Sequence, residues 1–172
     1  MVLSTWTELD EIDRRILAHL CRDARSTFEA IAQDVGLRRP SVHERVRKLE
    51  KAGVVRGYHA DVAPEAVGAD LVAYVFVKAA SGGKDCLTRC GELAQRLKRL
   101  PEVLEFHTVA GVEDALVKVR VRDVRDLERL VLKEISGTPG VQDVVTKVVL
   151  STQFERTLAV PQAPAVVPRR RR

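Results

Sequence analysis

The stretch TFEAIAQDVGLRRPSVHERVRKLEKAG, residues 27–53, indicates two short amphipathic helices joined by a tight turn. Its apolar residues recur at intervals of three and four, which is the spacing of one helix face. The first helix is expected to stop at Gly36, because glycine is the usual residue just past a helix end. The next helix begins near Pro40, since proline in a first turn lacks only an N–H that has no partner there. Two such helices are typical of a helix-turn-helix.

Another amphipathic helix is expected to precede this pair, over residues 9–22, with Asp10 as its N-cap. The second helix starts at Ser26 or Thr27, and Ser26 with Glu29 has the spacing of a capping box. The apolar faces of the three helices together form a small core. Its expected members are Leu9, Ile12, Ile16, Leu17, Leu20, Phe28, Ile31, Ala32, Val35, Val42, Val46 and Leu49.

The positive charge of the chain is concentrated in two places. The 172 residues contain 29 Lys and Arg against 24 Asp and Glu, a formal net charge of +5. Residues 38–57 alone contain seven basic and two acidic side chains, and the last fifteen residues contain four basic and no acidic ones. A uniformly basic surface is therefore excluded, and the basic residues of the helix-turn-helix fall on the third helix.

This pattern predicts a double-stranded DNA partner, because the major groove admits one α-helix whose first residues reach base edges while flanking cations neutralise phosphates. The residues expected nearest the bases are Arg38, Arg39, Ser41, His43 and Glu44. Those expected to hold the DNA backbone are Arg45, Arg47, Lys48 and Arg56. Two alternatives stay open: the basic residues form only a solvated helix face, or Arg45 pairs with Asp34 or Glu50 within the domain.

The segments on either side of the third helix also bear on DNA binding. Arg38 and Arg39 stand at its start, where the helix dipole disfavours cations by up to ~1 kcal/mol unless an anion lies nearby. A DNA phosphate would be that anion. After the helix, VVRGYHADV at 54–62 alternates enough to predict a short strand or wing, which would bring Arg56 and His59 near the DNA backbone.

The rest of the chain alternates between strand and helix patterns in the order βαββαβ. Strands are expected at 71–79, 103–109, 115–121 and 141–150, and helices at 85–100 and 124–136. The first of these helices is expected to bury Leu87, Leu93, Leu97 and Leu100. The second is expected to bury Leu127, Leu130, Val131 and Ile135.

The two halves of this region echo each other. PEVLEFHT at 101–108 and PGVQDVVT at 139–146 both begin with Pro-x-Val and end on Thr. The echo and the element order predict a ferredoxin-like sandwich, in which two helices cover one face of a four-stranded antiparallel sheet. Tyr74, Phe76 and many valines make the other face partly apolar, which calls for a partner, most simply a second copy of the chain. The fold class is α+β.

Several segments resemble one protein family in their order and spacing. LDEIDRRILAHL, AIAQDVGL and SVHERVRKLEKAGVVRGYHADV look like the N-terminal half of the Lrp/AsnC (leucine-responsive, feast/famine) transcriptional regulators. LPEV, VAGVED and the terminal VVLS are similar to the ligand-binding and oligomerisation domain of that family. The resemblance covers about residues 8–156. It implies a homodimer held by the C-terminal sheets, further assembly into tetramers or octamers, and amino-acid sensing in clefts between dimers.

The effector segment of the family, usually close to Thr-Gly-Asp-Tyr-Asp, falls on Ala110, Gly111, Val112, Glu113 and Asp114. Only Gly111 and Asp114 keep the usual residue type. An amino acid presents an ammonium and a carboxylate, so a site needs an acidic side chain and exposed backbone N–H groups. The weaker effector candidates are Thr108 and Thr146. The alternative is an ordinary β-turn, in which Gly and Asp are favoured anyway.

The expected domain organisation has four parts: a winged three-helix, helix-turn-helix domain at 1–60, a linker at 61–70, the ferredoxin-like ligand-binding and oligomerisation domain at 71–156, and a tail at 157–172. The tail is rich in proline, ends in four arginines and is predicted to be disordered. It is either an electrostatic arm for DNA or a solvated terminus without a role.

Other classes of function find little support. The longest apolar run, at 71–77, is too short to span a bilayer, and the N-terminus lacks a secretory signal, so a cytoplasmic protein is expected. Cys86 and Cys90 would share a helix face, as a metal or redox pair does, but no second ligand pair accompanies them. Reduced thiols and no metal or cofactor are expected.

An enzyme is not expected either. Ser81-Gly82-Gly83-Lys84 lacks the remaining residues of a phosphate-binding loop, and no nucleophile with a matching base is evident. The serious alternative to a ligand-modulated regulator is a nucleoid-like architectural protein, which would use the same DNA-binding domain without a ligand.

Overall fold

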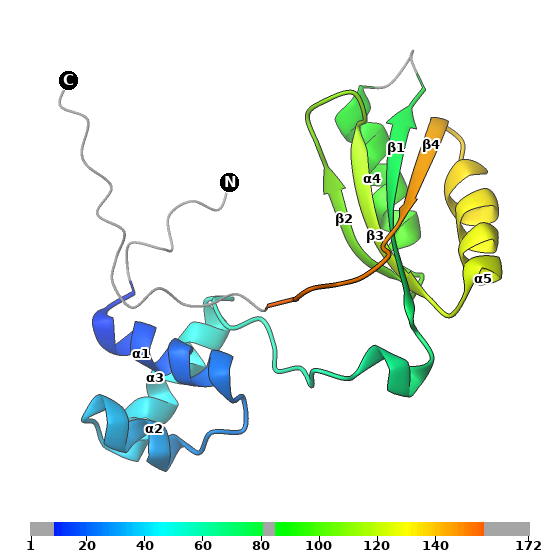
Figure 1. Cartoon of the computed structure of the whole chain (residues 1–172). Helices are drawn as coiled ribbons and strands as arrows, with labels where there is room; N and C mark the ends of the chain where they lie inside the picture. The colour runs from blue at the N-terminus through cyan, green and yellow to red at the C-terminus, as the bar shows by residue number, and fades with distance from the viewer. Residues whose placement is uncertain (1–8, 81–84, 157–172) are drawn as a thin grey trace. The chain divides into compact units, whose positions relative to one another are not determined.

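The computed structural model describes residues 9–80 and 85–156. The described residues divide into two compact units (Figure 1): one contains residues 9–61 and 154–156, and the other lies within Val62–Gln153. None of the helices in the described residues is long and apolar enough to cross a membrane. The predicted tail at 157–172 and the segment 81–84 lie outside the described residues.

Three helices form the N-terminal unit, as predicted: α1 (Glu11–Arg22), α2 (Phe28–Val35) and α3 (Arg39–Lys51). Asp10 is the N-cap of α1 and accepts a hydrogen bond from the Asp13 amide at 2.7 Å. The N-cap of α2 is Thr27, whose Oγ1 accepts from the Ala30 amide at 3.2 Å. The predicted capping box beginning at Ser26 is therefore wrong, because the threonine after it occupies the cap position.

The inward faces of the three helices meet in one core. Its buried members are Ile16, Leu17, Leu20, Ile31, Ala32, Val35, Val42, Val46 and Leu49, all of them predicted from helical spacing. Leu9, Ile12 and Phe28 pack against this core and are partly buried. Full burial of one such aliphatic side chain stabilises a fold by ~1.5–3 kcal/mol, so the apolar stripe of α3 holds that helix in place.

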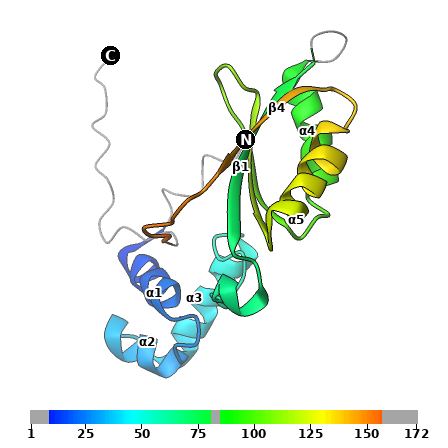
Figure 2. The same ribbon diagram turned by 45° about the vertical axis from the view of Figure 1, so that its right-hand side comes forward.

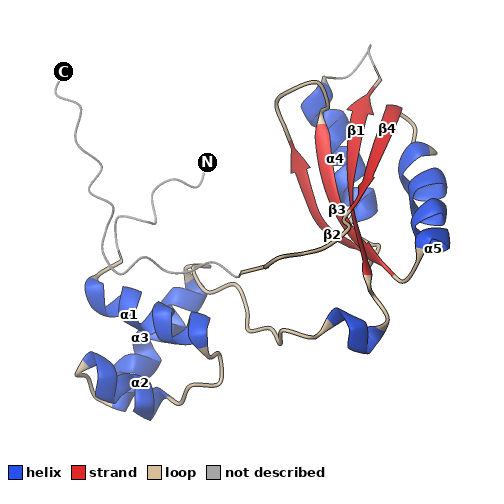
Figure 3. Cartoon of the chain, viewed as in Figure 1, coloured by secondary structure: helices blue, strands red, loops and turns tan. Residues whose placement is uncertain are grey.

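The described residues after α3 contain no strand before β1, so the predicted wing at 54–62 is wrong (Figure 3). The amides of Val54 and Val55 both donate to the carbonyl of Leu49, at 2.9 and 3.2 Å. Their side chains pack against the helical core. The two valines therefore close the end of α3 instead of pairing with another strand. A 3₁₀ helix, η2 (Pro64–Val67), follows in the predicted linker.

The second unit has the predicted βαββαβ order. Its elements are β1 (Leu71–Ala79), α4 (Cys86–Leu97), β2 (Val103–Thr108), β3 (Ala115–Val121), α5 (Val124–Arg129) with its π-helical continuation η3 (Leu130–Ser136), and β4 (Val141–Val148). The strands form one antiparallel sheet in the order β2-β3-β1-β4. Helices α4 and α5 cover the same face of this sheet (Figure 2). The predicted ferredoxin-like sandwich and the α+β class are confirmed.

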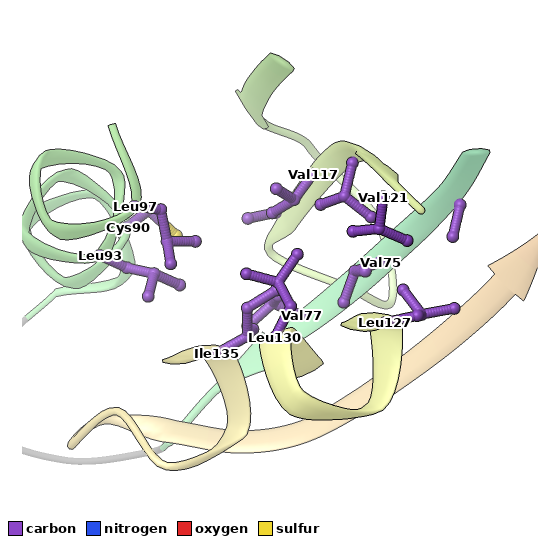
Figure 4. Close-up of a cluster of buried hydrophobic side chains, with 13 residues drawn as sticks. Val75, Val77, Cys90, Leu93, Leu97, Val117, Val121, Leu127, Leu130 and Ile135 are labelled. Carbon is purple, nitrogen blue, oxygen red and sulfur yellow. The ribbon is translucent and has the colours of Figure 1, made fainter. Parts of the chain in front are cut away.

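The core of the second unit lies between the sheet and these helices (Figure 4). Alternate residues of the two central strands point into it, because side chains of a strand alternate between its faces. These strand residues are Ala73, Val75, Val77, Ala115, Val117, Val119 and Val121. The helical side supplies Cys90, Leu93, Leu97, Leu127, Leu130 and Ile135. Val131, also predicted to be buried, packs against the cluster only partly buried.

Leu87 contradicts the prediction, because 72% of its side chain is exposed. Each residue of an α-helix is rotated by about 100° around the axis from the one before it. Cys86, Cys90 and Leu97 therefore point in nearly the same direction from α4, whereas Leu87 points about 90° away from them. The core position predicted for Leu87 is thus taken by a cysteine. Leu100 packs against the core from beyond the end of α4, partly buried.

The sheet face opposite the helices has apolar side chains. Tyr74, Phe76 and Leu116 share this face and are each partly exposed. Val145, which pairs with Phe76 across to β4, is 44% exposed. The ammonium of Lys147 lies 4.7 Å from the centroid of the Phe76 ring. Among the described residues of this unit, no helix covers this face (Figure 2).

Candidate DNA-binding helix and effector turn

The turn between α2 and α3 helps to set the orientation of α3 on the helical core. Gly36 has a φ of 73°, in the left-handed region that glycine adopts without steric strain. The amide of Leu37 donates to the carbonyl of Ala32 at 3.0 Å, and the Leu37 side chain packs against the core. Because Val42 and Val46 face the core as well, the remaining sides of α3 lie at the surface.

The start of α3 is basic and has no side-chain cap. Arg38 is the N-cap residue, but its side chain makes no capping hydrogen bond. The first turn contains no acidic residue, and Arg38, Arg39 and Ser41 are exposed. The first amides of a helix lack intrahelical partners and give that end a partial positive charge. This end of α3 is therefore suited to an anion.

The exposed face continues along α3 and beyond it. Its further predicted DNA-binding residues are His43, Glu44, Arg47, Lys48 and Arg56, all exposed. The ring of His43 packs against the ring of Phe28 from α2, with the centroids 5.4 Å apart. Lys48 Nζ lies 3.1 Å from Glu44 Oε1, but these side chains are 73% and 68% exposed. Such an exposed pair contributes little to stability, so either partner can exchange it for a contact with DNA.

Arg45 differs from its neighbours on α3, because it is engaged inside the domain. Its Nη1 lies 2.6 Å from Asp10 Oδ2 and 2.8 Å from Asp13 Oδ1. Hydrogen bonds to Asp10 and then to Asp13 raise the pKa of Arg45. Partial burial acts to raise the pKa of Asp10, but hydrogen bonds from the Asp13 amide and from Arg45 outweigh it, and the pKa is lowered. Arg45 thus joins α3 to the first turn of α1.

The alternative that Arg45 pairs within the domain holds, but its suggested partners, Asp34 and Glu50, are wrong because they bind other residues. Asp34 Oδ2 lies 3.0 Å from His19 Nε2 and 2.9 Å from Arg15 Nη2, which joins α2 to α1. These hydrogen bonds, that of His19 first, lower the pKa of Asp34. Tyr58 Oη donates to Glu50 Oε1 at 2.9 Å. Partial burial and the Glu50 carboxylate raise the pKa of Tyr58 to about 12.

The turn between β2 and β3, here called the effector turn, spans residues 109–114 and contains the predicted effector segment. The amide of Val109 donates to the carbonyl of Asp114 at 3.0 Å and closes the turn. The amide of Asp114 donates to the carbonyl of Val77 at 2.9 Å, and Lys78 Nζ donates to the carbonyl of Val112. The effector turn is thereby attached to the end of β1.

The carboxylate of Asp114 is part of this attachment. Its Oδ2 accepts from the Ala79 amide at 2.8 Å. The Ala79 hydrogen bond is the main reason why the pKa of Asp114 is lowered, with smaller effects from Cys86 and Lys78. Asp114 therefore anchors the turn, while Glu113, half-buried, stands beside it.

Gly111 and Ala110 are exposed at the tip of the turn. The φ of Gly111 lies outside the left-handed region, and a Cβ placed on it would meet no atom within 4 Å. The backbone of the turn therefore does not require glycine. Thr108 ends β2 next to the turn, whereas Thr146 lies on β4 opposite Val75. Because β2 and β4 are the outer strands, one chain does not bring Thr146 to the turn.

Lys78, Ala79 and Cys86 were not predicted to belong to this site. The first two reach the effector turn across 34 and 35 sequence positions, so local periodicity contains no signal for these contacts. The only available signal is the strand order, since β1 and β3 are neighbours and Val77 pairs with Ala115. Among the described residues, no group of three His, Cys, Asp or Glu side chains is arranged to hold a metal ion.

Both units match models of a known protein family. Residues 9–50 match the AsnC-type helix-turn-helix domain, and residues 72–159 match the Lrp/AsnC ligand binding domain. The chain belongs to the Lrp/AsnC family. This Lrp/AsnC protein is a DNA-binding transcriptional regulator, and the family predicted from sequence is confirmed.

Relatives and solved structures align with nearly the whole Lrp/AsnC chain. The HTH-type transcriptional regulator FL11 of Pyrococcus horikoshii is 34% identical over 149 residues, covering 87% of this chain and 94% of that protein. A feast or famine regulatory protein from M. tuberculosis, solved in complex with L-methionine, is 35% identical with a TM-score of 0.79 and covers 89% and 99% of the two chains. A transcriptional regulator from Neisseria meningitidis, solved in complex with L-Met, is 30% identical with a TM-score of 0.79 and covers 89% and 96%.

Proposed function

We propose that this Lrp/AsnC regulator binds double-stranded DNA through the exposed face of α3, and that an amino acid bound at the effector turn modulates this binding. The observation that carries the DNA part is the basic start of α3, which has no side-chain cap and lies on a helix-turn-helix. Its exposed guanidinium groups complement the phosphates and base edges of a major groove.

The proposed contacts divide into two groups. Contacts with base edges come from the first two turns of α3, that is from Arg38, Arg39, Ser41, His43 and Glu44. Arginine binds guanine through two hydrogen bonds, and a glutamate accepts from cytosine N4. Phosphate contacts come from Arg47, Lys48 and Arg56. Arg45 acts through its ion pairs, which hold α3 against α1, rather than as a main phosphate ligand.

An amino-acid effector suits the chemistry of the effector turn. Two relatives with solved structures are described as complexes with L-methionine. In this chain, the exposed backbone at Ala110, Gly111 and Val112 can bind a carboxylate, and the carboxylate of Glu113 can bind an ammonium. Asp114 then serves mainly to hold the turn, because its Oδ2 already accepts from the Ala79 amide.

We also propose that the chain forms a homodimer. The sheet face of Tyr74, Phe76, Leu116 and Val145 is partly apolar and partly exposed, with Lys118 and Lys147 on the same face, and a second copy would cover it. Assembly into tetramers or octamers would bring the outer strands of different subunits together. Such contacts would give Thr146 a route to the effector turn of another subunit.

The DNA part is tested by selecting duplexes from a random pool with the full chain and titrating the best one. Replacement of Arg39 by Ala should weaken binding to this duplex by at least tenfold, whereas replacement of Arg22 by Ala, an exposed arginine on α1, should leave it unchanged. Equal affinities for selected and scrambled duplexes would rule out sequence-specific binding and favour the architectural alternative.

The effector part is tested separately, by adding the twenty amino acids one at a time to a thermal-shift assay and to the DNA titration. A ligand that binds the folded protein raises its melting temperature, and a coupled ligand also changes DNA affinity. No response in either assay would leave a DNA-binding protein without an amino-acid switch.

A further inference from the structure

The first turn of α4 contains two thiols next to the effector turn. Cys86 Sγ and Cys90 Sγ are 3.8 Å apart, one helical turn from each other. Cys90 is buried, and its Sγ lies 3.7 Å from the carbonyl oxygen of Asp114. Cys86 is partly exposed and lies beside it. The two sulfur atoms therefore contact each other, and Cys90 also contacts the residue that anchors the turn.

We propose that Cys86 and Cys90 are an oxidation site, at which hydrogen peroxide forms a reversible disulfide that loosens the effector turn. Residues four apart on a helix have Cβ atoms about 5–6 Å apart, which is about 1.5 Å more than the 3.5–4.5 Å usual in disulfides, so the backbone must move. The sulfur atoms must approach from 3.8 Å to the bond length of about 2.05 Å. Cys86 is the first residue of α4, where a helix deforms most easily, so its backbone can supply this movement.

The reaction balances with one equivalent of hydrogen peroxide. The Cys86 sulfur, which is the more exposed, takes one oxygen atom as the O–O bond breaks, and the first water leaves. The Cys90 sulfur then attacks the resulting sulfenic acid, so that an S–S bond forms, the S–O bond breaks and a second water leaves. The two thiols together lose two electrons and two protons, and the peroxide is reduced to water.

The disulfide changes what holds Asp114. A disulfide has no S–H, so the Asp114 carbonyl loses the donor that the Cys90 thiol supplies. The Ala79 amide, the bond from the Asp114 amide to Val77 and the bond from Lys78 to Val112 then remain as the attachments of the effector turn to β1. Any effect of oxidation on an amino-acid response rests on the function proposed above, whereas the disulfide and the loosened turn do not.

The rate of the reaction should depend on pH. Partial burial, Asp114 and Cys90 raise the pKa of the Cys86 thiol to about 11. Since the thiolate is the nucleophile, the pair stays reduced in a neutral, reducing compartment and reacts faster as the pH rises. This behaviour agrees with the reduced thiols predicted from the sequence. Because oxidation is slow at neutral pH, the site should respond to prolonged exposure to an oxidant.

The test uses the full chain with Cys21 replaced by Ser, because Cys21 is exposed and could form disulfides between chains. The protein is treated with hydrogen peroxide, and its mass and free thiols are measured before and after addition of dithiothreitol. Amide hydrogen exchange of Ala79 and of residues 109–114 is followed on the same samples. Oxidation should remove two hydrogen atoms and two free thiols, and exchange of these amides should rise by roughly fivefold, the effect of one lost hydrogen bond. Dithiothreitol should reverse both changes.

A Cys86→Ser variant is the matched control, because it keeps the Cys90 thiol beside Asp114 but cannot be cross-linked. Peroxide should leave the exchange of its effector turn unchanged. Addition of oxygen atoms without loss of hydrogen would show sulfinic acid instead of a disulfide and would overturn the proposal. A disulfide that forms with unchanged exchange at Ala79 and 109–114 would overturn the coupling to the turn. Neither result depends on whether an amino acid binds.

Discussion

Arg45 Nη1 lies 2.6 Å from Asp10 Oδ2, so a residue of α3 is bound to the cap of α1. The same guanidinium also binds Asp13, whose side chain is only 17% exposed. Two residues that lie 35 positions apart in the sequence thus join α1 and α3. The basic face of α3 is therefore not one uniform cationic surface, since this arginine is committed to the fold.

Replacing Arg45 by Ala should act differently from replacing Arg47 by Ala. The first change should lower the free energy of unfolding by about 1 kcal/mol, because partly exposed ion pairs contribute at most about that much. The second should leave stability unchanged and reduce the salt slope of DNA binding by about one, because one phosphate contact is lost. Urea unfolding and DNA titrations at several salt concentrations measure both quantities. Identical salt slopes for Arg47→Ala and the unmodified chain would contradict the proposed phosphate contact.

The lowered pKa of Asp10 predicts an acid dependence of the N-terminal unit. Its ordinary value is 3.8, and a lowered value in the folded protein means that the ionised form is bound more tightly there. The resulting stabilisation is present above pH 3.8 and is lost as the pH falls through the lower folded value. An Asp10→Asn variant keeps a capping oxygen but has no charge. Hydrogen exchange of the α1 and α3 amides should show it less stable than the parent at neutral pH, with the difference vanishing toward pH 2. A constant difference over this range would exclude the ionisation of Asp10 as its cause.

The helices and strands could be predicted because each depends on local apolar spacing. The stripe of Val42, Val46 and Leu49, for example, is evident within one helix and is buried as expected. Contacts between distant segments could not be predicted, because neither Asp10 nor Asp114 shows in its own neighbourhood which donor will reach it. The wing at 54–62 failed for a related reason: Val54 and Val55 have strand propensity, but their amides bind the carbonyl of Leu49.

The orientation of α4 predicts that two leucines on this helix differ in their effect on the free energy of unfolding, so that one variant is the control for the other. Leu97→Ala should lower the free energy of unfolding by about 2–5 kcal/mol, since the side chain is 0% exposed and its removal leaves a cavity. Leu87→Ala, ten residues earlier on the same helix, should change it by no more than about 0.5 kcal/mol, since 72% of that leucine is exposed. Thermal unfolding of both variants compares them directly. A large cost for Leu87→Ala would restore the helix register predicted from the sequence.

The effector turn can be tested without disturbing its fold. Gly111→Val should keep the stability of the chain, because nothing lies within 4 Å of the added Cβ, yet it should obstruct a ligand bound against the exposed backbone. Glu113→Gln should weaken binding of an amino acid by roughly tenfold or more, the effect of losing a charged hydrogen bond. Glu128→Gln, an exposed carboxylate on α5, is the matched control. Calorimetric titration with the amino acid that gives the largest thermal shift measures the three affinities, and equal values would place the ligand elsewhere.

Two valines on opposite faces of β4 can show whether subunits associate through one specific face of the sheet or through exposed apolar surface in general. Val145 and Val148 are almost equally exposed, at 44% and 45%, but they lie on opposite sides of the sheet, since they pair with Phe76 and Ala73 respectively. Val145→Lys introduces a charge on the face proposed to bind a second copy, where burial of an unpaired ammonium is costly. It should raise the dimer dissociation constant by at least a hundredfold, whereas Val148→Lys should leave it within a few-fold. Sedimentation velocity over a concentration series gives both constants. If Val148→Lys dissociates the dimer and Val145→Lys does not, the subunits associate through the other side of the sandwich.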